Sequence, residues 1–290
     1  MKRIFLFIVT NLAVLALLSL VLFIVENVFG VHLMQGGTGS LLVFAAIFGF
    51  GGSLISLALS KWTAKRIMGV RVIENPQTEL ERWLAGTVKR LAAQARIGMP
   101  EVGIFDSEEM NAFATGARRN AALVAVSSGL LRSMSRTQVE AVLGHEITHV
   151  ANGDMVTLAL LQGVLNTFVI FLARIIGGIV DRAILRNDRQ DSGIGFFLTT
   201  MVAQFILGIL ASVIVCWYSR RREFRADRGG ADLAGSGNMI DALQMLKRSQ
   251  GQPMPPQMQA FGINIGSADG FMRLFMSHPP LDERIAALKT

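Results

Sequence analysis

Cysteine is almost absent from this chain, and charged residues are scarce. The single cysteine, Cys216, lies inside an apolar run, so an intrachain disulfide is excluded and a small buried hydrophobe is its simpler role. A chain without disulfides suits a reducing compartment such as the cytoplasm. Only 17% of the 290 residues are charged, whereas 51% are hydrophobic. This balance excludes an ordinary soluble protein and indicates that much of the apolar surface faces lipid.

The chain also lacks a recognisable nucleic-acid-binding motif, although its net charge is +7. Its basic residues stand beside apolar segments, as in Lys2-Arg3, Lys61–Arg66 and Arg220–Arg222. This is the position expected for the cytoplasmic flanks of membrane spans. We therefore expect a lipid bilayer as partner and no nucleic acid.

Two apolar segments near the start, Ile4–Val25 and Leu41–Ser60, are each long enough to cross a hydrocarbon core of roughly 30 Å as a helix. The first follows Met1-Lys2-Arg3 and is longer than the apolar region of a cleavable signal peptide, so we interpret it as an uncleaved anchor. The link between the two segments contains no Lys or Arg. This asymmetry predicts a hairpin with both ends in the cytoplasm.

A second apolar pair, Met155–Val180 and Ile194–Tyr218, is less regular. Its first member contains Gln162, Asn166 and Arg174, and three arginines occupy the loop that follows. Either the pair is a second transmembrane hairpin, which we prefer, or it is a long apolar hairpin packed on a soluble domain.

The stretch between the two pairs has the composition of a soluble domain. An amphipathic helix is expected from Thr78 to about Arg96, and Ser135 with Gln138 forms a capping box at the start of another. Three short segments with β character separate these helices: Val102–Phe105, Ala112–Thr115 and Ala122–Ser127. We predict a small antiparallel sheet.

Soluble chain returns after the last apolar segment. Helices are expected at about Arg220–Leu233 and Asn238–Ser249, and a last one begins near Pro280. Between them, Gly251–Gly270 is rich in Gly, Pro, Met and Gln, which is typical of a mobile loop.

The helix that Ser135 opens contains His145-Glu146-Ile147-Thr148-His149. Two histidines four residues apart project from one helix face and can share a metal ion at roughly 2.0–2.1 Å. Glu146 can take a proton from a water molecule whose pKa zinc lowers towards about 7. The alternative is a solvated helix face, but the many apolar neighbours indicate a packed helix, in which unliganded polar groups are costly. The pattern predicts a zinc-dependent peptidase.

A catalytic zinc ion needs a third protein ligand and an open position for water. A metzincin-type third histidine is excluded, because Asn152 and Met155 stand where that motif requires glycine and histidine. Glu223 and Asp227 lie one helical turn apart, so Glu223 could bind zinc while Asp227 accepts the N–H of a liganding histidine. Spacing alone does not distinguish this arrangement from a solvated charged helix whose acids pair with neighbouring arginines.

The combination of motifs resembles the membrane-bound HtpX-type heat-shock proteases, relatives of the CAAX prenyl endoprotease. The similarity covers essentially the whole chain, through Asn111–Gly116, His145–Asp154, Glu223–Asp227, and Ser277–Pro280 with Arg284. It implies an integral membrane, mainly α-helical fold, in which about four transmembrane helices accompany a gluzincin-like catalytic domain with the small sheet. It also implies one Zn²⁺ per chain, bound by His145, His149 and Glu223, with Glu146 as general base.

The segment of Asn111, Ala112, Phe113 and Ala114 looks like the family's sheet edge, along which a substrate peptide could add as a strand. The alternative is an ordinary core strand. Strand addition uses main-chain hydrogen bonds, so it would not demand a particular substrate sequence.

Four other residues are expected near the metal. Asp227 and Asn152 would support the ligands through hydrogen bonds. His278 and Arg284 could stabilise the oxyanion of the tetrahedral intermediate. Equally, His278 and the prolines after it could only begin a helix.

The chain thus divides into residues 1–60, a transmembrane hairpin; 61–154, the first part of a catalytic domain; 155–218, a second apolar hairpin; and 219–290, the second catalytic part. Both catalytic parts lie on the cytoplasmic side if all four spans are real. The resemblance implies a bacterial inner membrane and the clearance of damaged membrane proteins, or unfolded polypeptides, under stress.

Two alternatives remain. An intramembrane metalloprotease is disfavoured, because the zinc-binding helix contains Arg136, Gln138 and Glu140. A non-catalytic membrane adaptor with a vestigial metal site is disfavoured by the presence of Glu146, which it would not need.

Overall fold

The structure is a computed structural model that describes residues 38–183, 194–250 and 272–290. The expected span Ile4–Val25 and the expected loop Gly251–Gly270 lie outside the described residues. The described chain divides into two units. One contains residues 38–56 and the described part of 158–215, and the other contains 57–157 and the described part of 216–290.

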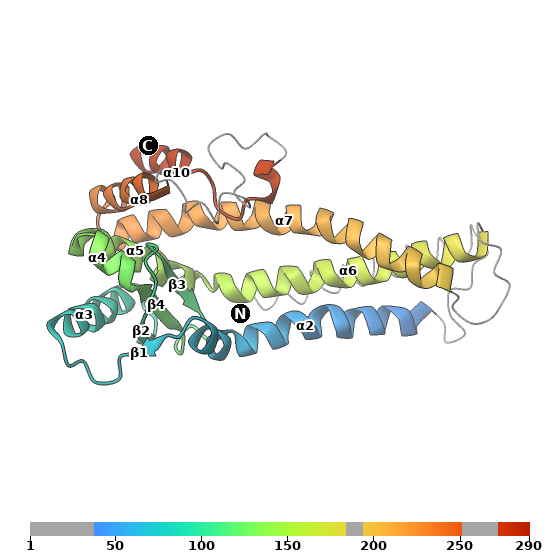
Figure 1. The fold of residues 1–290 in the computed structure, drawn as a ribbon, viewed down its shortest axis with the longest axis horizontal. Helices are drawn as coiled ribbons and strands as arrows, with labels where there is room; N and C mark the ends of the chain where they lie inside the picture. Colours follow the sequence, from blue (N-terminus) through green and yellow to red (C-terminus); the bar gives the residue numbers. More distant parts are fainter. Residues whose placement is uncertain (1–37, 184–193, 251–271) are drawn as a thin grey trace. The chain divides into compact units, whose positions relative to one another are not determined.

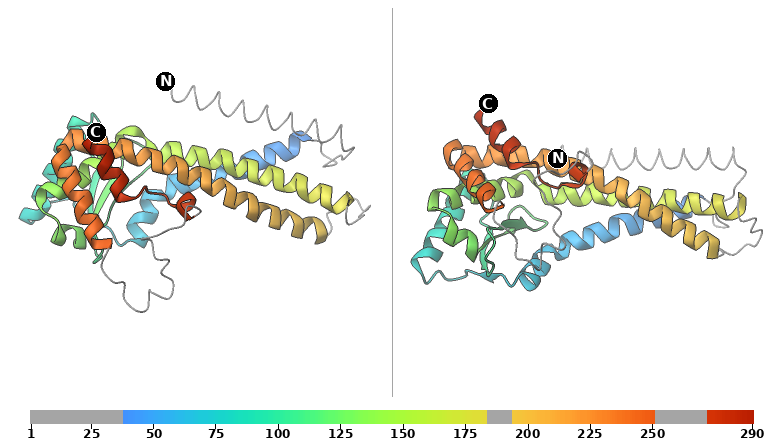
Figure 2. Two further views of the ribbon diagram at one scale, coloured as in Figure 1. Left: turned by 90° about the horizontal axis from the view of Figure 1, so that it is seen from above. Right: turned by 45° about the horizontal axis from the view of Figure 1, so that its top comes forward.

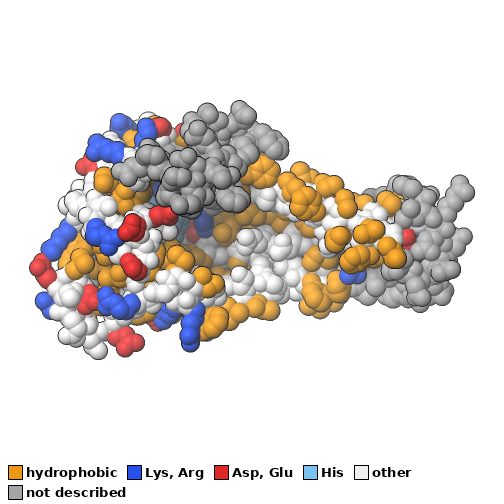
Figure 3. Space-filling view, in the orientation of Figure 1, with side chains coloured by type: hydrophobic (Ala, Val, Ile, Leu, Met, Phe, Trp, Pro, Cys, Tyr) orange, Lys and Arg blue, Asp and Glu red, His pale blue; other side chains and the backbone are white. Residues whose placement is uncertain are grey.

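Three long helices carry the apolar segments: α2 (Thr38–Ile67), α6 (Asp154–Ala183) and α7 (Ile194–Ala234) (Figure 1). Each is long and apolar enough to cross a membrane. Hydrophobic side chains cover much of their exposed surface, as lipid-facing helices require (Figure 3). Both members of the second apolar pair are therefore candidate spans, and the expectation of a mainly helical membrane protein is confirmed.

Close approach of backbones holds these helices together. A Cβ atom added at Gly49 of α2 would lie 2.3 Å from the hydroxyl oxygen of Thr167 on α6. One added at Gly177 of α6 would lie 2.1 Å from the hydroxyl oxygen of Thr200 on α7. Small residues at such crossings are the usual basis of helix packing in lipid, where no hydrophobic force acts between helices.

The sheet has the strand order β1-β2-β4-β3. Strand β2 (Glu101–Phe105) pairs with β1 (Arg71–Val72) in antiparallel fashion and with β4 (Leu123–Ser127) in parallel fashion, while β3 (Ala112–Thr115) pairs antiparallel with β4. The prediction of a wholly antiparallel sheet was therefore wrong. The chain leaves β2, forms β3 beyond the position of β4, and returns along β4, which gives β4 the direction of β2.

The two faces of β4 are both buried, and each belongs to a different core. Val124 and Val126 join the main core with α3 (Glu79–Gln94) and α5 (Arg136–Asn152). Leu123 and Ala125 pack on the other side with Phe105. The central strand of the sheet is thus a continuous apolar run, as strands buried on both faces usually are.

Helices α8 (Ser236–Gln250) and α10 (Leu281–Lys289) complete this unit, together with short helix α4 (Ser128–Ser133) and the 3₁₀ turn η2 (Met272–Phe275). Helix α5 packs on α3, α8 and β3, and α10 lies beside α8 (Figures 1 and 2). The helix that bears the histidine pair is therefore surrounded by the core of its unit.

Local sequence signals set the ends of α3 and α5. Thr78 caps α3 and Ser135 caps α5, each in a capping box with a residue three positions on, Glu81 and Gln138. Helix α5 ends at Gly153, whose φ of 67° suits glycine. The predicted start of α5 is confirmed. Helix α7, by contrast, runs unbroken through Tyr218, where the sequence had been divided into an apolar segment and a separate helix.

Candidate metal centre

The two histidines of α5 point to one spot. His145 and His149 are both buried, with 7% of each residue exposed. Their Nε2 atoms lie 3.1 Å apart, and the rings are perpendicular. The four-residue spacing has thus placed two imidazole nitrogens together on one helix face.

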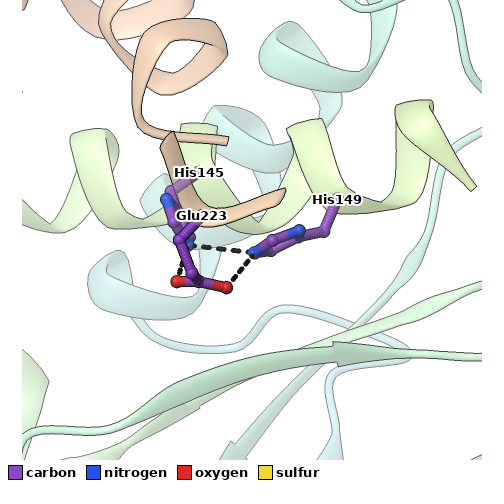
Figure 4. A group of neighbouring side chains, drawn as sticks. All are labelled: His145, His149 and Glu223. Carbon is purple, nitrogen blue, oxygen red and sulfur yellow. Dashed lines mark hydrogen bonds and ion pairs between the residues drawn. The ribbon is translucent and has the colours of Figure 1, made fainter. Parts of the chain in front are cut away.

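Glu223 comes from α7, and its carboxylate lies against both imidazoles (Figure 4). Its Oε1 lies 3.3 Å from Nε2 of His149, and its Oε2 lies 3.5 Å from Nε2 of His145. The residue is fully buried. One ligand atom from each of these three residues lies within 4.8 Å of the others. The structure therefore brings together the two histidines and a carboxylate more than seventy residues further along the chain.

Glycines allow α7 to approach α5 closely enough for this contact. A Cβ atom at Gly230 of α7 would lie 2.9 Å from the backbone nitrogen of His145, and one at Gly229 would lie 2.4 Å from a methyl carbon of Thr148. On α5, a Cβ at Gly144 would lie 3.2 Å from the carbonyl oxygen of Gly230. Side chains at these positions would hold the helices apart and move Glu223 away from the histidines.

Each histidine also has a carboxylate at its other ring nitrogen. Asp227 Oδ1 lies 3.0 Å from Nδ1 of His145, as the sequence suggested. Asp154 Oδ2 lies 2.7 Å from Nδ1 of His149. Asn152, which was also expected to support the ligands, is the last residue of α5, and the carboxylate at Nδ1 of His149 is that of Asp154.

Asp154 was missed as a supporting residue, although it closes the motif that begins at His145. It is 2% exposed and is the first residue of α6. Two features of the sequence could have indicated it. Gly153 reverses the chain just before it, and an acidic side chain at a helix start is favoured by the helix dipole.

The donor set fits a divalent cation. Because each Nδ1 faces a carboxylate, each neutral imidazole keeps its proton there, so its Nε2 lone pair can face inwards towards a metal ion. Glu223 adds two buried oxygens, and within the described part of the chain neither accepts a well-aligned hydrogen bond. Converging lone pairs without protons repel one another, and a cation is the group that relieves this. Two imidazoles and one carboxylate are a ligand set of catalytic zinc.

The charges around the histidines favour a positive group. Burial alone would lower the pKa of His149, but the carboxylate of Asp154, with Glu223 and Glu146 adding to it, raises that pKa to about 9. The pKa of His145 is likewise raised, because Asp227 and Glu223 outweigh its burial. The carboxylates around the two rings therefore stabilise a positive charge between them, either a second imidazole proton or a metal ion in its place.

Arg284 of α10 lies inside this group and is 7% exposed. Its Nε and Nη2 donate to the two oxygens of Asp227 at 2.7 and 2.5 Å. Its Nη1 lies 3.5 Å from Oε2 of Glu223. The guanidinium is thus committed to the acids of α7, which suits a residue that positions Asp227 better than one that contacts substrate.

His278 lies at the edge of the group. Its Nδ1 is 2.8 Å from Oε2 of Glu223, while 60% of its side chain is exposed. A pocket opens beside it, lined by Arg220, Met276, Glu283 and neighbouring residues. This histidine is therefore accessible from solvent and close to a proposed ligand, as a group that contacts substrate must be.

Two residues of α7 hold the segment that leads to His278. Arg220 donates through Nη1 to the carbonyl oxygens of Arg273, Leu274 and Met276, at 3.0, 3.2 and 2.7 Å. The thiol of Cys216, one turn earlier, lies 3.3 Å from the carbonyl oxygen of Phe275. Positions 216, 220, 223 and 227 lie along one face of α7, and each contacts a residue between 273 and 284.

Glu146 and the expected substrate strand complete the site. Glu146 follows His145 on α5 and is half-buried. Strand β3 is an edge strand, paired only with β4 among the described strands, and it packs against α5. Asn111, just before it, is exposed, and its backbone is fixed by Ser127 through Asn111 N–H to Oγ at 3.0 Å and Ser127 N–H to Asn111 O at 2.8 Å.

Comparisons with known proteins point to one family. The profile of peptidase family M48 matches residues 78–290. The chain is 60% identical over 295 residues to a protein named Protease HtpX from Alkalilimnicola ehrlichii, covering 100% of this chain and 98% of that protein. It is 60% identical over 293 residues to a Protease HtpX homolog from Thiobacillus denitrificans, with coverage of 100% and 99%. Its fold is similar to the crystal structure of S. mikatae Ste24p, with a TM-score of 0.64 at 18% identity, over 98% of this chain and 67% of that one.

Proposed function

The chain belongs to peptidase family M48, and on this basis we propose that it is a zinc endopeptidase of the bacterial inner membrane that cleaves misfolded or damaged membrane proteins on the cytoplasmic side. That it is a membrane metallopeptidase follows from its family and its apolar helices. The choice of zinc rests on one observation, the convergence of two imidazole lone pairs and one carboxylate on a buried point.

His145, His149 and Glu223 would hold the metal. Bound Zn²⁺ would act as a Lewis acid, lowering the pKa of a water molecule to about 7 and polarising the substrate carbonyl. Glu146, next to the first ligand, would take the proton of the attacking water and return it to the leaving amine. His278, which is exposed and adjacent to Glu223, would donate a hydrogen bond to the oxyanion.

Asp227, Asp154 and Arg284 would act by positioning other groups. The two aspartates fix the orientation of the imidazoles through their Nδ1 atoms. Arg284 fixes Asp227 through two parallel hydrogen bonds, a geometry that only arginine provides. These contacts would keep both Nε2 atoms aimed at the metal.

The edge strand β3 supports the proposed substrate class. A substrate segment that pairs with β3 would be recognised mainly through its backbone. Such recognition suits unfolded segments of many sequences, which misfolded proteins expose. Residues Asn111, Ala112, Phe113 and Ala114 would contribute this edge.

The cytoplasmic orientation is supported by charge. Helix α2 ends with Lys61, Lys65 and Arg66, and Arg220–Arg222 follow the apolar part of α7. The link before α2 contains no Lys or Arg. Basic residues concentrate on the cytoplasmic ends of spans, and in this chain they adjoin the metallopeptidase unit.

The test is Glu146→Gln in the purified protein, with casein and a membrane protein as substrates. Removing a general base should lower the cleavage rate by about 10²–10⁴-fold, while the zinc content stays that of the wild type. Glu140→Gln is a matched control, because Glu140 is on the same helix and pairs with Arg90 away from the ligands. Unchanged cleavage in Glu146→Gln would refute the mechanism.

The same variant distinguishes an enzyme from an adaptor. Cells that carry Glu146→Gln should accumulate membrane proteins that wild-type cells remove. If both strains contain the same membrane proteins at the same levels, clearance does not depend on hydrolysis by this chain.

A further inference from the structure

A turn at residues 116–121 joins β3 to β4 next to the last turns of α2. Lys61 of α2 donates a hydrogen bond to the carbonyl oxygen of Ala121 at 3.0 Å. Lys61 and Lys65 also pair with Glu101 at the start of β2, at 2.8 and 2.5 Å. These contacts fix the turn beside the point where the apolar part of α2 ends.

The end of α2 carries the side chains that mark a membrane boundary. Trp62 is 62% exposed, and Lys61, Lys65 and Arg66 surround it in the sequence. Tryptophan is enriched at the level of the lipid headgroups, and lysine and arginine occupy the adjoining cytoplasmic flank. A turn that is hydrogen-bonded to Lys61 is therefore expected at headgroup depth.

The turn presents two arginines at that depth. Arg118 and Arg119 are exposed, and among the residues that the structure describes neither guanidinium makes a hydrogen bond or ion pair. Their backbone is nevertheless held. Ala121 N–H donates to the carbonyl oxygen of Arg118 at 3.1 Å, and Gly98 N–H donates to Oδ1 of Asn120 at 2.8 Å. Two unpaired cations on a fixed backbone are a suitable receptor for anionic groups.

We propose that residues 116–121 contact the membrane surface, with Arg118 and Arg119 binding the phosphates of anionic phospholipid headgroups. Glu101, the acid at the base of the turn, does not oppose this, because two lysines already neutralise it. Each cation near an anionic leaflet strengthens such a contact by roughly fivefold. Arginine suits the role, since its guanidinium binds phosphate in a bidentate manner.

The proposed lipid contact would also affect substrate capture. This second step rests on the peptidase function proposed above, whereas the lipid contact can be tested without it. Strand β3 ends at Thr115, immediately before the turn. Anchoring the turn to headgroups would hold one end of this edge strand at the membrane surface. A polypeptide segment that emerges from the bilayer would then meet the strand at that end.

A fluorescent probe at Ala117, an exposed residue of the turn, tests the proposal. The full-length protein would carry Ala117→Cys as the labelling site, Glu146→Gln to remove the proposed peptidase activity, and Cys216→Ser, whose hydroxyl can still donate to the carbonyl oxygen of Phe275. It is reconstituted in vesicles of phosphatidylcholine alone or with one third phosphatidylglycerol, each containing a headgroup-attached quencher. Quenching should be stronger in the anionic vesicles than in phosphatidylcholine alone, and this difference should shrink as salt is added.

Two variants complete the test. Arg118→Gln with Arg119→Gln should weaken the contact by roughly tenfold or more and abolish the difference between the two vesicle types. Arg132→Gln, at an exposed arginine of α4 beyond the other end of β4, should leave the quenching unchanged. Equal quenching in both vesicle types, no quenching in either, or full quenching without the two arginines would each overturn the proposal. Because the protein is inactive throughout, these results do not depend on the proposed peptidase activity.

Discussion

Replacing Gly230 with alanine tests whether metal binding depends on the close packing of α7 against α5. The added Cβ would lie 2.9 Å from the backbone nitrogen of His145 and 3.2 Å from its Cα. Ordinary contacts begin at 3.4 Å, so the helices must separate by about 0.5 Å, the difference between 3.4 and 2.9 Å. Backbone atoms cannot rotate away, and the neighbouring helices must absorb the shift.

The separation carries Glu223, on α7, away from both histidines on α5. Overpacking of this kind costs about 1–3 kcal/mol. If this cost falls on the zinc-bound state, the Kd for zinc rises about 5- to 150-fold, because each 1.4 kcal/mol changes a Kd tenfold. Competition with a chromophoric chelator measures the Kd for zinc in the purified protein.

Gly86→Ala is the matched control. Gly86 lies in α3, and nothing lies within 4 Å of a Cβ built there. Alanine is favoured over glycine inside a helix by roughly 0.5–1 kcal/mol, so this variant should unfold at a higher temperature and bind zinc as the wild type does. Equal zinc affinity for Gly230→Ala and the wild type would refute the reasoning.

Two other predictions concern carboxylates. Asp154→Asn removes the charge that orients His149 and should weaken zinc binding about 10- to 100-fold. Asp241→Asn, at an exposed acid of α8, is the control and should bind zinc as the wild type does. Equal losses of zinc affinity in the two variants would contradict the role assigned to Asp154. Glu81 is held by Arg71 and by the backbone N–H groups of residues 77 and 78, which lower its pKa from 4.5 to about 2. Its contribution to stability is therefore complete above about pH 4.5 and disappears as the pH falls through about 2. Zinc-free Glu81→Gln should unfold more easily than zinc-free wild type at pH 7, and the gap in melting temperature should narrow below pH 4.5; a gap independent of pH would count against this.

The elements whose signals are local in the sequence could be predicted. The capping box at Ser135 and the spacing of His145 and His149 lie within one helix, so helical geometry alone places both imidazoles on one face. The apolar runs of α2, α6 and α7 are similarly explicit. In each case the neighbours along the chain determine the structure.

The third ligand could not be derived from spacing alone. Glu223 reaches the histidines because glycines at positions 144, 229 and 230 let two helices meet, and this contact joins parts of the chain far apart in sequence. Only the resemblance to a known family had favoured Glu223 over a solvated carboxylate. The direction of β4 is a tertiary property for the same reason, since a β-pattern carries no information on its partner's orientation.

Two further differences have local causes. The sequence was divided at Tyr218 because hydropathy falls there, but no glycine or proline stands next to Tyr218 to end the helix, and α7 continues to Ala234. Asp154 was assigned no role, because its proximity to His149 depends on the left-handed turn at Gly153. The fall in hydropathy along the sequence therefore marks the end of the apolar stretch, whereas the end of a helix depends on local backbone features such as the left-handed Gly153.

The central claim is that Glu223 completes the metal site with the two histidines. Metal analysis of dialysed wild-type protein and Glu223→Gln tests it most directly, since glutamine keeps the size of the side chain but removes the anionic ligand. We expect about one zinc per wild-type chain and loss of zinc from the folded variant. A folded Glu223→Gln protein that retains zinc with wild-type stoichiometry after dialysis would contradict the account.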